Sequence, residues 1–368
     1  MKNYKVLIKT KSKKYTIIIG KNILTKIKNY FINEKIYYNK CLIVVDTKIS
    51  KTFLNKVKKN FNKKDCIFYN FVSNEKNKNL NSVNKIINLL FKNNFSRNDC
   101  LISLGGGITG DVVGFAASIY KRGLKFINVP TTLLAQVDSS IGGKTGVNNI
   151  YGKNLIGSFM QPDLVLSDIN FLKSLPKREL VCGYGEILKH SIIDNRNTFN
   201  FLKKNFNKIL NLESSFVIKA IADSCRIKKS IVEKDEKEKN LRKILNLGHT
   251  FAHAYEASLS YSKKLNHGEA VILGMVSSAK FSFENKILNK KDYEEIINHI
   301  NNLKIPVNLN YYFKKKDVGS IIKYMKADKK NNSSKINLIL IKKIGKIILG
   351  SKFKEPKIRK FISKELIY

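Results

Sequence analysis

Residues 101–148 contain the feature that most constrains the fold of this chain. A short apolar run at 101–104 enters three consecutive glycines at 105–107, and a helical pattern follows with Asp111 in its first turns. Because glycine carries no Cβ, backbone N–H groups at such a turn can approach phosphate oxygens closely. A second buried strand is expected at 126–129. The pattern indicates a dinucleotide-binding turn, although its spacing is not that of the G-x-G-x-x-G motif.

Hydroxyl, glycine and lysine residues continue beyond this second strand. The strand is followed by PTT at 130–132, and DSS at 138–140 leads into GGK at 142–144. Another lysine lies within GKN at 152–154. Charge-assisted hydrogen bonds to phosphate are about twice as strong as neutral ones. The segment therefore indicates a ligand that carries phosphate groups.

The order of the expected elements indicates two kinds of structure in one chain. In the first half, β-rich runs alternate with helical patterns, which is typical of a mostly parallel sheet with helices on both faces and ligands beyond the carboxyl ends of its strands. Strands are expected at 6–8 and 15–19 as a hairpin, with buried strands at 42–45, 67–71, 101–104, 126–129 and 164–166 and a helix at 80–91. Later helices are expected at 186–193, 215–232, 250–258, 269–283, 293–303 and 318–325, before a hairpin of 336–341 with 346–349. We predict a Rossmann-like α/β domain at 1–170 that binds the dinucleotide, and a mainly helical domain at 171–368.

The basic composition does not by itself identify a partner. The net charge of +41 comes from 69 basic against 28 acidic residues, a balance that in other chains indicates a nucleic acid or an acidic membrane surface. Here lysine is spread along the whole chain and arginine is scarce, whereas nucleic-acid binding favours clustered arginine and exposed aromatic side chains. We expect no dedicated nucleic-acid partner.

Cysteine use and hydropathy favour a cytoplasmic protein. The five cysteines show no C-x-x-C pairing, so neither a disulfide framework nor a cysteine zinc site is predicted: Cys41, Cys66, Cys100, Cys182 and Cys225. The N-terminal segment lacks the unbroken apolar run of a signal peptide, and no stretch of about 18 uncharged apolar residues occurs. We expect no membrane association.

The five histidines allow more than one metal site. His249 and His253 are four residues apart on an expected helix and would share one face, which is a metal-ligand spacing. Glu186 and His190 offer a second pair with the same spacing. Spacing alone leaves these alternatives open.

Several blocks of the sequence resemble the 3-dehydroquinate synthase family, over roughly residues 40 to 345 and in consistent order. They are GGGITGD at 105–111, YKRG at 120–123, VPTTLLAQVDSSIGGKTGVN at 129–148, GKNLIGSF at 152–159, GYGEILK at 183–189, DEKEKNLRKILNLGHTFAHAYE at 235–256 and LNHGEAVILGM at 265–275. The resemblance implies a shikimate-pathway enzyme that converts 3-deoxy-D-arabino-heptulosonate 7-phosphate into 3-dehydroquinate and phosphate. Its implied cofactors are NAD⁺ and Zn²⁺, or Co²⁺ in its place.

The resemblance also implies a metal site and a set of polar residues around the substrate. The implied metal ligands are Glu186, His249 and His267, with His253 near the phosphate and no role for His190. Residues that match positions around a phosphorylated and carboxylated substrate are Arg122, Asp138, Lys144, Lys153, Asn154, Lys189, Lys228, Arg242, Asn246 and Lys329, with Lys330 as an alternative to Lys329.

The implied cofactor contacts lie mainly in the first half of the chain. Asp46 follows an expected strand and would accept a hydrogen bond from a ribose hydroxyl, which favours NAD⁺ over NADP⁺. The family loop near the adenosine matches Ser73, Asn74, Glu75, Lys76, Asn77 and Lys78, where Asn74 replaces the usual glycine. The remaining contacts match Gly107, Ile108, Thr109, Gly110, Asp111, Thr131, Thr132, Lys144 and Lys153, with Phe171, Leu172, Lys173 and Ser174 beside the adenine.

Competing functions make different demands on these residues. A glycerol-dehydrogenase-like alcohol dehydrogenase could share the glycine turn and the metal, but it has no use for cations around a phosphate. Another sugar phosphate cyclase is a closer rival. The non-enzyme alternative is a basic nucleic-acid-binding protein, or a relative that has lost activity and is kept for an interaction. We expect a homodimer or a monomer, and the sequence does not choose between them.

Overall fold

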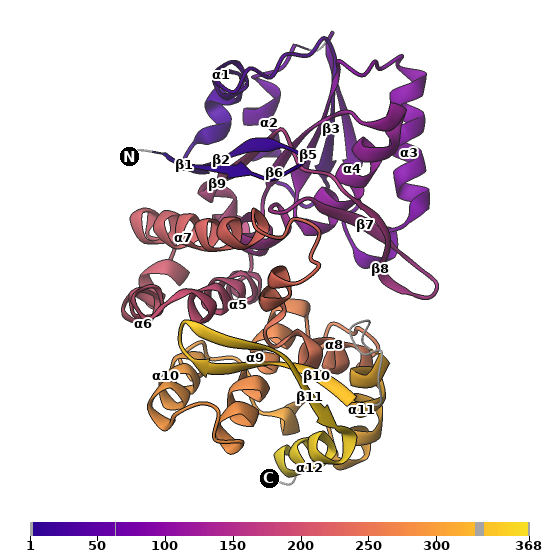
Figure 1. The fold of residues 1–368 in the computed structure, drawn as a ribbon. Helices are drawn as coiled ribbons and strands as arrows, with labels where there is room; N and C mark the ends of the chain where they lie inside the picture. The colour runs from indigo at the N-terminus through magenta and orange to yellow at the C-terminus, as the bar shows by residue number, and fades with distance from the viewer. Residues whose placement is uncertain (1–2, 63, 328–334, 367–368) are drawn as a thin grey trace. The chain divides into compact units, whose positions relative to one another are not determined.

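The parallel sheet predicted for the first half of the chain is present in the computed structural model, which describes residues 3–62, 64–327 and 335–366 (Figure 1). Two compact units are formed. The first consists of the residues up to Leu180 together with Asn207–Lys237, and the second of Val181–Phe206 together with the residues from Glu238 onward. Helix α7 (Ser214–Val232) thus packs with the first unit, on β1 and β2. The functional division predicted at residue 170 concerns ligand binding and stays a prediction.

Seven strands form the sheet of the first unit, in the order β1-β2-β9-β6-β5-β3-β4. The predicted hairpin of β1 and β2 is antiparallel, and every other pairing is parallel. The strands are β1 (Tyr4–Lys9), β2 (Lys14–Gly20), β3 (Cys41–Asp46), β4 (Cys66–Phe71), β5 (Cys100–Gly105), β6 (Lys125–Pro130) and β9 (Leu164–Asp168). The expectation of a fully buried strand at 67–71 is wrong, because β4 is the edge strand and its middle residues are half-buried or exposed.

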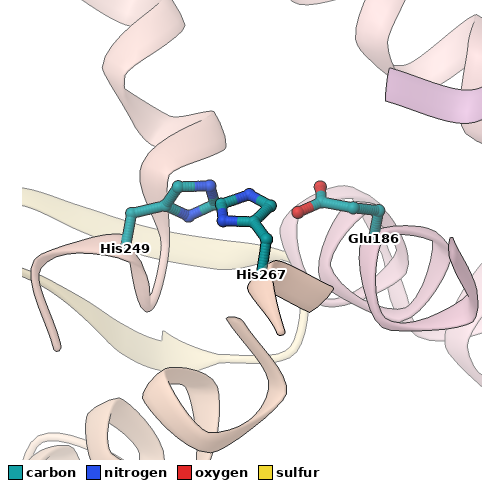
Figure 2. Close-up of side chains that lie close together, drawn as sticks. All are labelled: Glu186, His249 and His267. Carbon is teal, nitrogen blue, oxygen red and sulfur yellow. The ribbon is translucent and has the colours of Figure 1, made fainter. Parts of the chain in front are cut away.

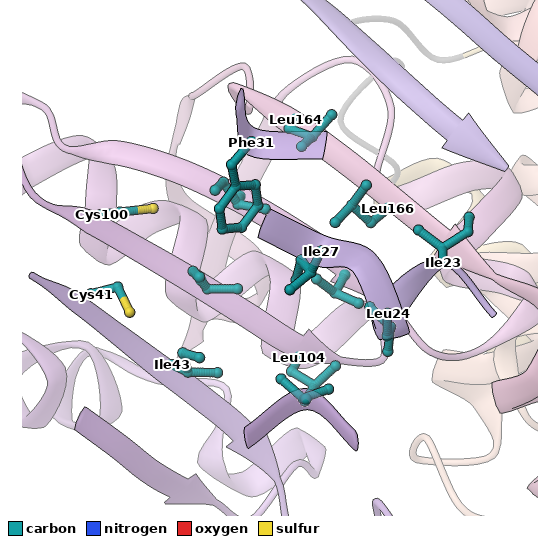
Figure 3. Close-up of a cluster of buried hydrophobic side chains, with 14 of the residues drawn as sticks. Ile23, Leu24, Ile27, Phe31, Cys41, Ile43, Cys100, Leu104, Leu164 and Leu166 are labelled. Carbon is teal, nitrogen blue, oxygen red and sulfur yellow. The ribbon is translucent and has the colours of Figure 1, made fainter. Parts of the chain in front are cut away.

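Both faces of the sheet are covered, because successive side chains of a strand point to opposite faces. In β3, Ile43 and Val45 pack with η1 (Ile23–Lys26) and α1 (Ile27–Asn33) in one cluster, part of which Figure 3 shows. Leu42 and Val44 belong to the cluster on the other face, with α3 (Leu80–Lys92) and α4 (Gly107–Ile119). The remaining helix of the first face is α2 (Lys51–Lys58).

A hairpin that was not predicted from the sequence follows the two glycines at 142–143. It joins β7 (Lys144–Asn149) to β8 (Gly152–Phe159), so Lys144 and Lys153 each stand at the start of a strand. Its close pairing needs glycine, because a Cβ on Gly157 would lie 2.2 Å from the carbonyl oxygen of Thr145. The stretch read from the sequence as a phosphate loop is therefore partly a β-ribbon.

The second unit is mainly helical, as predicted, and the closing hairpin of β10 (Lys335–Lys343) and β11 (Lys346–Lys354) is confirmed. Its helices include α8 (His249–Ser258), α9 (His267–Glu284), α10 (Lys290–Asn301), α11 (Val318–Ala327) and α12 (Glu355–Glu365). Helices α5 (Lys177–Asp194) and α6 (Arg196–Leu210) each have residues in both units. Within the described part of the chain, no helix has the length and apolar character needed to cross a membrane.

Candidate active site

Three side chains from distant parts of the sequence form a possible metal site in the second unit (Figure 2). Glu186 lies in the middle of α5, and His249 and His267 are the first residues of α8 and α9. One ligand atom from each lies within 4.8 Å of the others, and Figure 2 shows the carboxylate of Glu186 pointing toward the imidazole rings. One oxygen and two nitrogen ligands are a donor set that zinc accepts in catalytic sites, where further positions stay open. The expectation that α5 begins at Glu186 is wrong, since it begins at Lys177.

The chemistry of these donors fits a divalent cation. Glu186 is 1% exposed. The ammonium group of Lys189, one turn further along α5, makes an ion pair with Oε2 of Glu186. Burial lowers the pKa of His249 well below its ordinary value, and its Nδ1 faces the carbonyl oxygen of Leu247 at 3.3 Å. A neutral imidazole held in this way offers its Nε2 lone pair to a metal.

The two other histidine arrangements considered from spacing differ from this cluster. His253 follows His249 by one turn of α8, with 5.4 Å between the ring centres, but among the described residues it joins no group of three ligand atoms. His190 is fully buried in α5, and one of its ring nitrogens lies within 4.8 Å of a carboxylate oxygen of Glu186. The structure thus brings together the three ligands implied by the family resemblance and also the pair of Glu186 with His190, and the assignment stays a prediction.

Glycine residues next to the histidines allow the three helices to pack closely. A Cβ on Gly268 would lie 2.3 Å from the Cβ of Cys182 in α5, and a Cβ on Gly274 would lie 2.2 Å from the carbonyl oxygen of Gly248. Gly248 has a φ of 80°, a conformation that favours glycine, and it directly precedes His249. The short contacts position α9 against α5 and the start of α8, and so place the ligands.

Two cations predicted to surround the substrate are buried in the second unit. Lys189 and Arg242 are each 2% exposed. Arg242 lies in η6 (Leu241–Asn246), and Asn246 Nδ2 donates to Glu238 Oε1 at 2.6 Å. Burying a cation is costly unless an anion compensates its charge. The buried ammonium group of Lys189 beside the carboxylate of Glu186, and the buried guanidinium group of Arg242, are suited to a substrate with acidic groups.

In the first unit, Asp138 and Lys228 bind each other. Lys228 Nζ, on α7, donates to the carbonyl oxygen of Asp138 at 2.6 Å and to its Oδ1 at 2.5 Å. Lys153 Nζ lies 3.9 Å from Glu75 Oε1. Asn154 has a φ of 54° and accepts a hydrogen bond from Lys78. These polar contacts all lie within the first unit.

Arg122 is placed apart from this group. It ends η3 (Tyr120–Arg122), directly after α4, and β6 begins three residues later at Lys125. A helix of 13 residues spans about 20 Å, so Arg122 lies that far from Gly107 and beside the amino edge of the sheet. Within this chain's first unit, the structure does not bring Arg122 to the carboxyl ends of the strands. Lys329 and Lys330 lie outside the described residues.

The predicted cofactor residues gather at the carboxyl ends of the parallel strands, as expected for a dinucleotide site. Asp46 ends β3, is buried, and accepts a hydrogen bond from Lys48 N at 3.0 Å; burial raises its pKa. Gly107 begins α4, and Thr131 N donates to Gly105 O at 3.0 Å. The other segments are 73–78 around η2 (Glu75–Asn77), 131–132 after β6 and 171–174 in η5 (Ile169–Ser174). Asn74 is extended, with φ of −153°, so replacing the usual glycine causes no strain there.

Two family models match consecutive parts of this chain. The family model for the 3-dehydroquinate synthase N-terminal part matches residues 68–182, and that for the C-terminal part matches residues 183–331. The chain belongs to the 3-dehydroquinate synthase family. It is 58% identical over 362 residues to the 3-dehydroquinate synthase of Pelagibacter ubique (strain HTCC1062), covering 98% of each chain. It is 42% identical over 351 residues to that of Buchnera aphidicola subsp. Cinara cedri (strain Cc), covering 93% of this chain and 92% of the relative.

Solved structures of related cyclases share the fold. A 2-deoxy-scyllo-inosose synthase in complex with carbaglucose-6-phosphate, NAD⁺ and Co²⁺ matches with a TM-score of 0.87 and 25% identity, over 98% of this chain and 100% of that chain. A probable glycerol dehydrogenase from Sinorhizobium meliloti 1021 matches with a TM-score of 0.64 and 16% identity, over 95% of each chain, which shows a common fold alone. Membership of the 3-dehydroquinate synthase family favours the cyclase over the alcohol dehydrogenase considered from sequence.

One residue of this family member was missed in the sequence analysis. Glu256 Oε2 lies 2.9 Å from Nδ1 of His267. Glu256 ends the block HTFAHAYE and stands seven residues after His249, on the same face of α8. The seven-residue spacing was the signal in the sequence that Glu256 shares a helix face with His249. It does not reveal the contact with His267, because His267 belongs to another helix.

Proposed function

We propose that the chain catalyses the 3-dehydroquinate synthase reaction, in which 3-deoxy-D-arabino-heptulosonate 7-phosphate is converted into 3-dehydroquinate and phosphate. The observation that carries the proposal is the cluster of Glu186, His249 and His267 with the buried ammonium group of Lys189 beside it. A metal site alone would suit an alcohol dehydrogenase. A buried cation in the same cluster suits a substrate with acidic groups as well as a hydroxyl group.

The residues of this chain bind and orient, and the cofactors provide the reactive groups. When bound, NAD⁺ accepts and returns a hydride and the divalent cation polarises a substrate hydroxyl. Glu186, His249 and His267 would hold the cation, and Lys189 and Arg242 would compensate the charges of the substrate. Asp46 would bind the ribose of NAD⁺. Because the hydride returns, turnover requires no second redox substrate.

The proposal extends to partners and location. The substrate is a small phosphorylated sugar acid, and neither a nucleic acid nor a membrane takes part. We assign the enzyme to the cytoplasm, as a homodimer or a monomer. The surplus of lysine is incidental to catalysis, because it is spread along the chain and not gathered at the site.

Phosphate release tests the proposal. The protein with NAD⁺ and Zn²⁺ is given the heptulosonate 7-phosphate, and in parallel assays glucose 6-phosphate and glycerol. Rapid phosphate release with the first substrate alone is expected. Comparable turnover of glucose 6-phosphate would favour another sugar phosphate cyclase, the second candidate suggested by the likeness to 2-deoxy-scyllo-inosose synthase. Comparable NADH formation from glycerol would favour an alcohol dehydrogenase.

A further inference from the structure

Glu256 is a buried carboxylate that faces a predicted metal ligand. It is 5% exposed, and its Oε2 lies 2.9 Å from His267 Nδ1. Helix α8 carries Glu256 near its end and His249 at its start, while His267 begins α9. One helix therefore provides a metal ligand itself and a hydrogen-bond acceptor for the ligand on the next helix.

We propose that Glu256 is a positioning residue that sets the tautomer and ring orientation of His267 for a divalent cation. The carboxylate accepts a hydrogen bond from Nδ1–H, which leaves the lone pair on Nε2 available to a metal. Without the acceptor, the ring can rotate or carry its proton on Nε2. A carboxylate behind the imidazole also makes Nε2 a stronger donor. The inference rests on the proposed metal site.

Packing between α8 and α9 is a purely structural alternative for Glu256. The same two helices share another buried polar contact, in which the hydroxyl groups of Tyr255 and Ser277 lie 2.8 Å apart. Tyr255 adjoins Glu256 in sequence and is fully buried, but its hydroxyl contacts Ser277 and not a histidine. Tyr255→Phe thus removes a comparable helix contact without touching His267, and it is the matched control.

Three substitutions separate the effects of charge, acceptor and geometry. Glu256→Ala removes the acceptor and the charge. Glu256→Gln keeps a carbonyl oxygen that can accept from Nδ1–H but removes the charge. Glu256→Asp keeps the charge and shortens the side chain by one methylene. If Glu256 acts through His267, Glu256→Gln and Glu256→Asp should each retain part of the Zn²⁺ affinity that Glu256→Ala loses.

Metal affinity provides a readout that is independent of turnover. Each protein is freed of metal and titrated with Zn²⁺ against a chromophoric chelator, and Co²⁺ absorption spectra report the ligand geometry. We expect Glu256→Ala to bind Zn²⁺ about 10- to 100-fold more weakly than the parent, with an altered Co²⁺ spectrum. Glu256→Gln and Glu256→Asp should show smaller losses, and Tyr255→Phe should bind as the parent does.

The outcomes distinguish failure of this inference from failure of the proposed metal site on which it rests. Equal Zn²⁺ affinity in Glu256→Ala and the parent would overturn the positioning role while leaving the metal site intact. An equal loss in Tyr255→Phe would assign Glu256 to helix packing. A parent protein that binds no Zn²⁺ would overturn the metal site and this inference with it. Circular dichroism of the metal-free proteins checks folding, and Glu256→Gln carries the test if the alanine variant does not fold.

Discussion

The ammonium group of Lys78 lies 2.5 Å from Asp111 Oδ2 and 2.6 Å from Asn154 Oδ1. One buried cation therefore joins the loop after β4 to the first turns of α4 and to the β7–β8 hairpin. Each of these residues is predicted to contact the cofactor or the substrate. Lys78 thus fixes the relative positions of three segments of the candidate dinucleotide site.

Replacing Lys78 with methionine should destabilise the protein. Burial raises the pKa of Asp111, and removing its cation leaves a half-buried carboxylate without compensation, which costs roughly 1 to 3 kcal/mol. Denaturant unfolding measures the change. Lys85→Met, at an exposed position of α3, is the control and should change stability by less than about 0.5 kcal/mol. Adding Asp111→Asn should recover part of the loss, and a single variant as stable as the parent would contradict the linking role.

Removing both histidines of the metal cluster should abolish metal binding. The double variant His249→Ala, His267→Ala leaves Glu186 as the one remaining ligand of the set, and a single carboxylate does not hold a divalent cation tightly. Elemental analysis after dialysis measures the occupancy. His253→Ala is the control and should retain the metal. Full occupancy in the double variant would instead favour a site built on His190 and His253.

NAD⁺ should bind more tightly than NADP⁺. The carboxylate of Asp46 lies at the end of β3, where it would accept from a free ribose hydroxyl and repel a phosphate in its place. Calorimetric titration of the parent with both dinucleotides measures the preference. Asp46→Asn should reduce the difference in affinity between NAD⁺ and NADP⁺, since the amide carries no charge. Tighter binding of NADP⁺ by the parent would show that Asp46 does not face the ribose.

Glu236 should make stability depend on pH. Burial alone would raise its pKa, but hydrogen bonds from Ser12 and Gln161 outweigh burial and hold the pKa below its ordinary value. A carboxyl group with a lowered folded-state pKa stabilises the protein above its unfolded-state pKa, and the contribution is lost as the pH falls through the folded-state pKa.

Glu236→Gln should therefore be about 1 kcal/mol less stable than the parent at pH 7, because hydrogen bonds to a charged acceptor are stronger than those to a neutral one. The difference should shrink as the pH falls below about 4.3, the ordinary range for glutamate. Urea unfolding at several pH values measures it, with the exposed Glu294→Gln as control. A difference that is constant with pH would exclude the ionised carboxylate as its source.

Gly268→Ala should loosen the packing that positions the metal ligands. The added Cβ would meet Cys182 at 2.3 Å, and such overpacking costs roughly 1 to 3 kcal/mol. The midpoint temperature of thermal unfolding and the affinity for Zn²⁺ should both fall. Gly319→Ala in α11, where nothing lies within 4 Å of a new Cβ, should instead leave stability unchanged or raise it by up to about 1 kcal/mol. Equal effects of the two substitutions would contradict the packing argument.

The local pattern of the sequence was sufficient to predict most helices and strands of the fold. The glycine turn at 105–107 enters α4 as predicted, and the strands that alternate with helices form the parallel sheet. Hydrophobic periodicity identifies such elements because it reflects the side-chain period of a single strand or helix. The β7–β8 hairpin was missed, since its glycines and hydroxyls resemble a loop and the strands pair only with each other.

The sequence by itself determined the alternation of elements, the position of the glycine turn before α4 and, through its motif blocks, the family. Spacing could not choose between His249 with His253 and the set of Glu186, His249 and His267, because periodicity reports which residues share a helix face but not what that face meets. The tertiary structure adds what spacing lacks, because close glycine contacts between α5, α8 and α9 place Glu186, His249 and His267 together; their role as metal ligands stays a prediction. It also separated Lys78 and Lys228 from the many other lysines, since their burial beside Asp111 and Asp138 depends on segments that are distant in the chain.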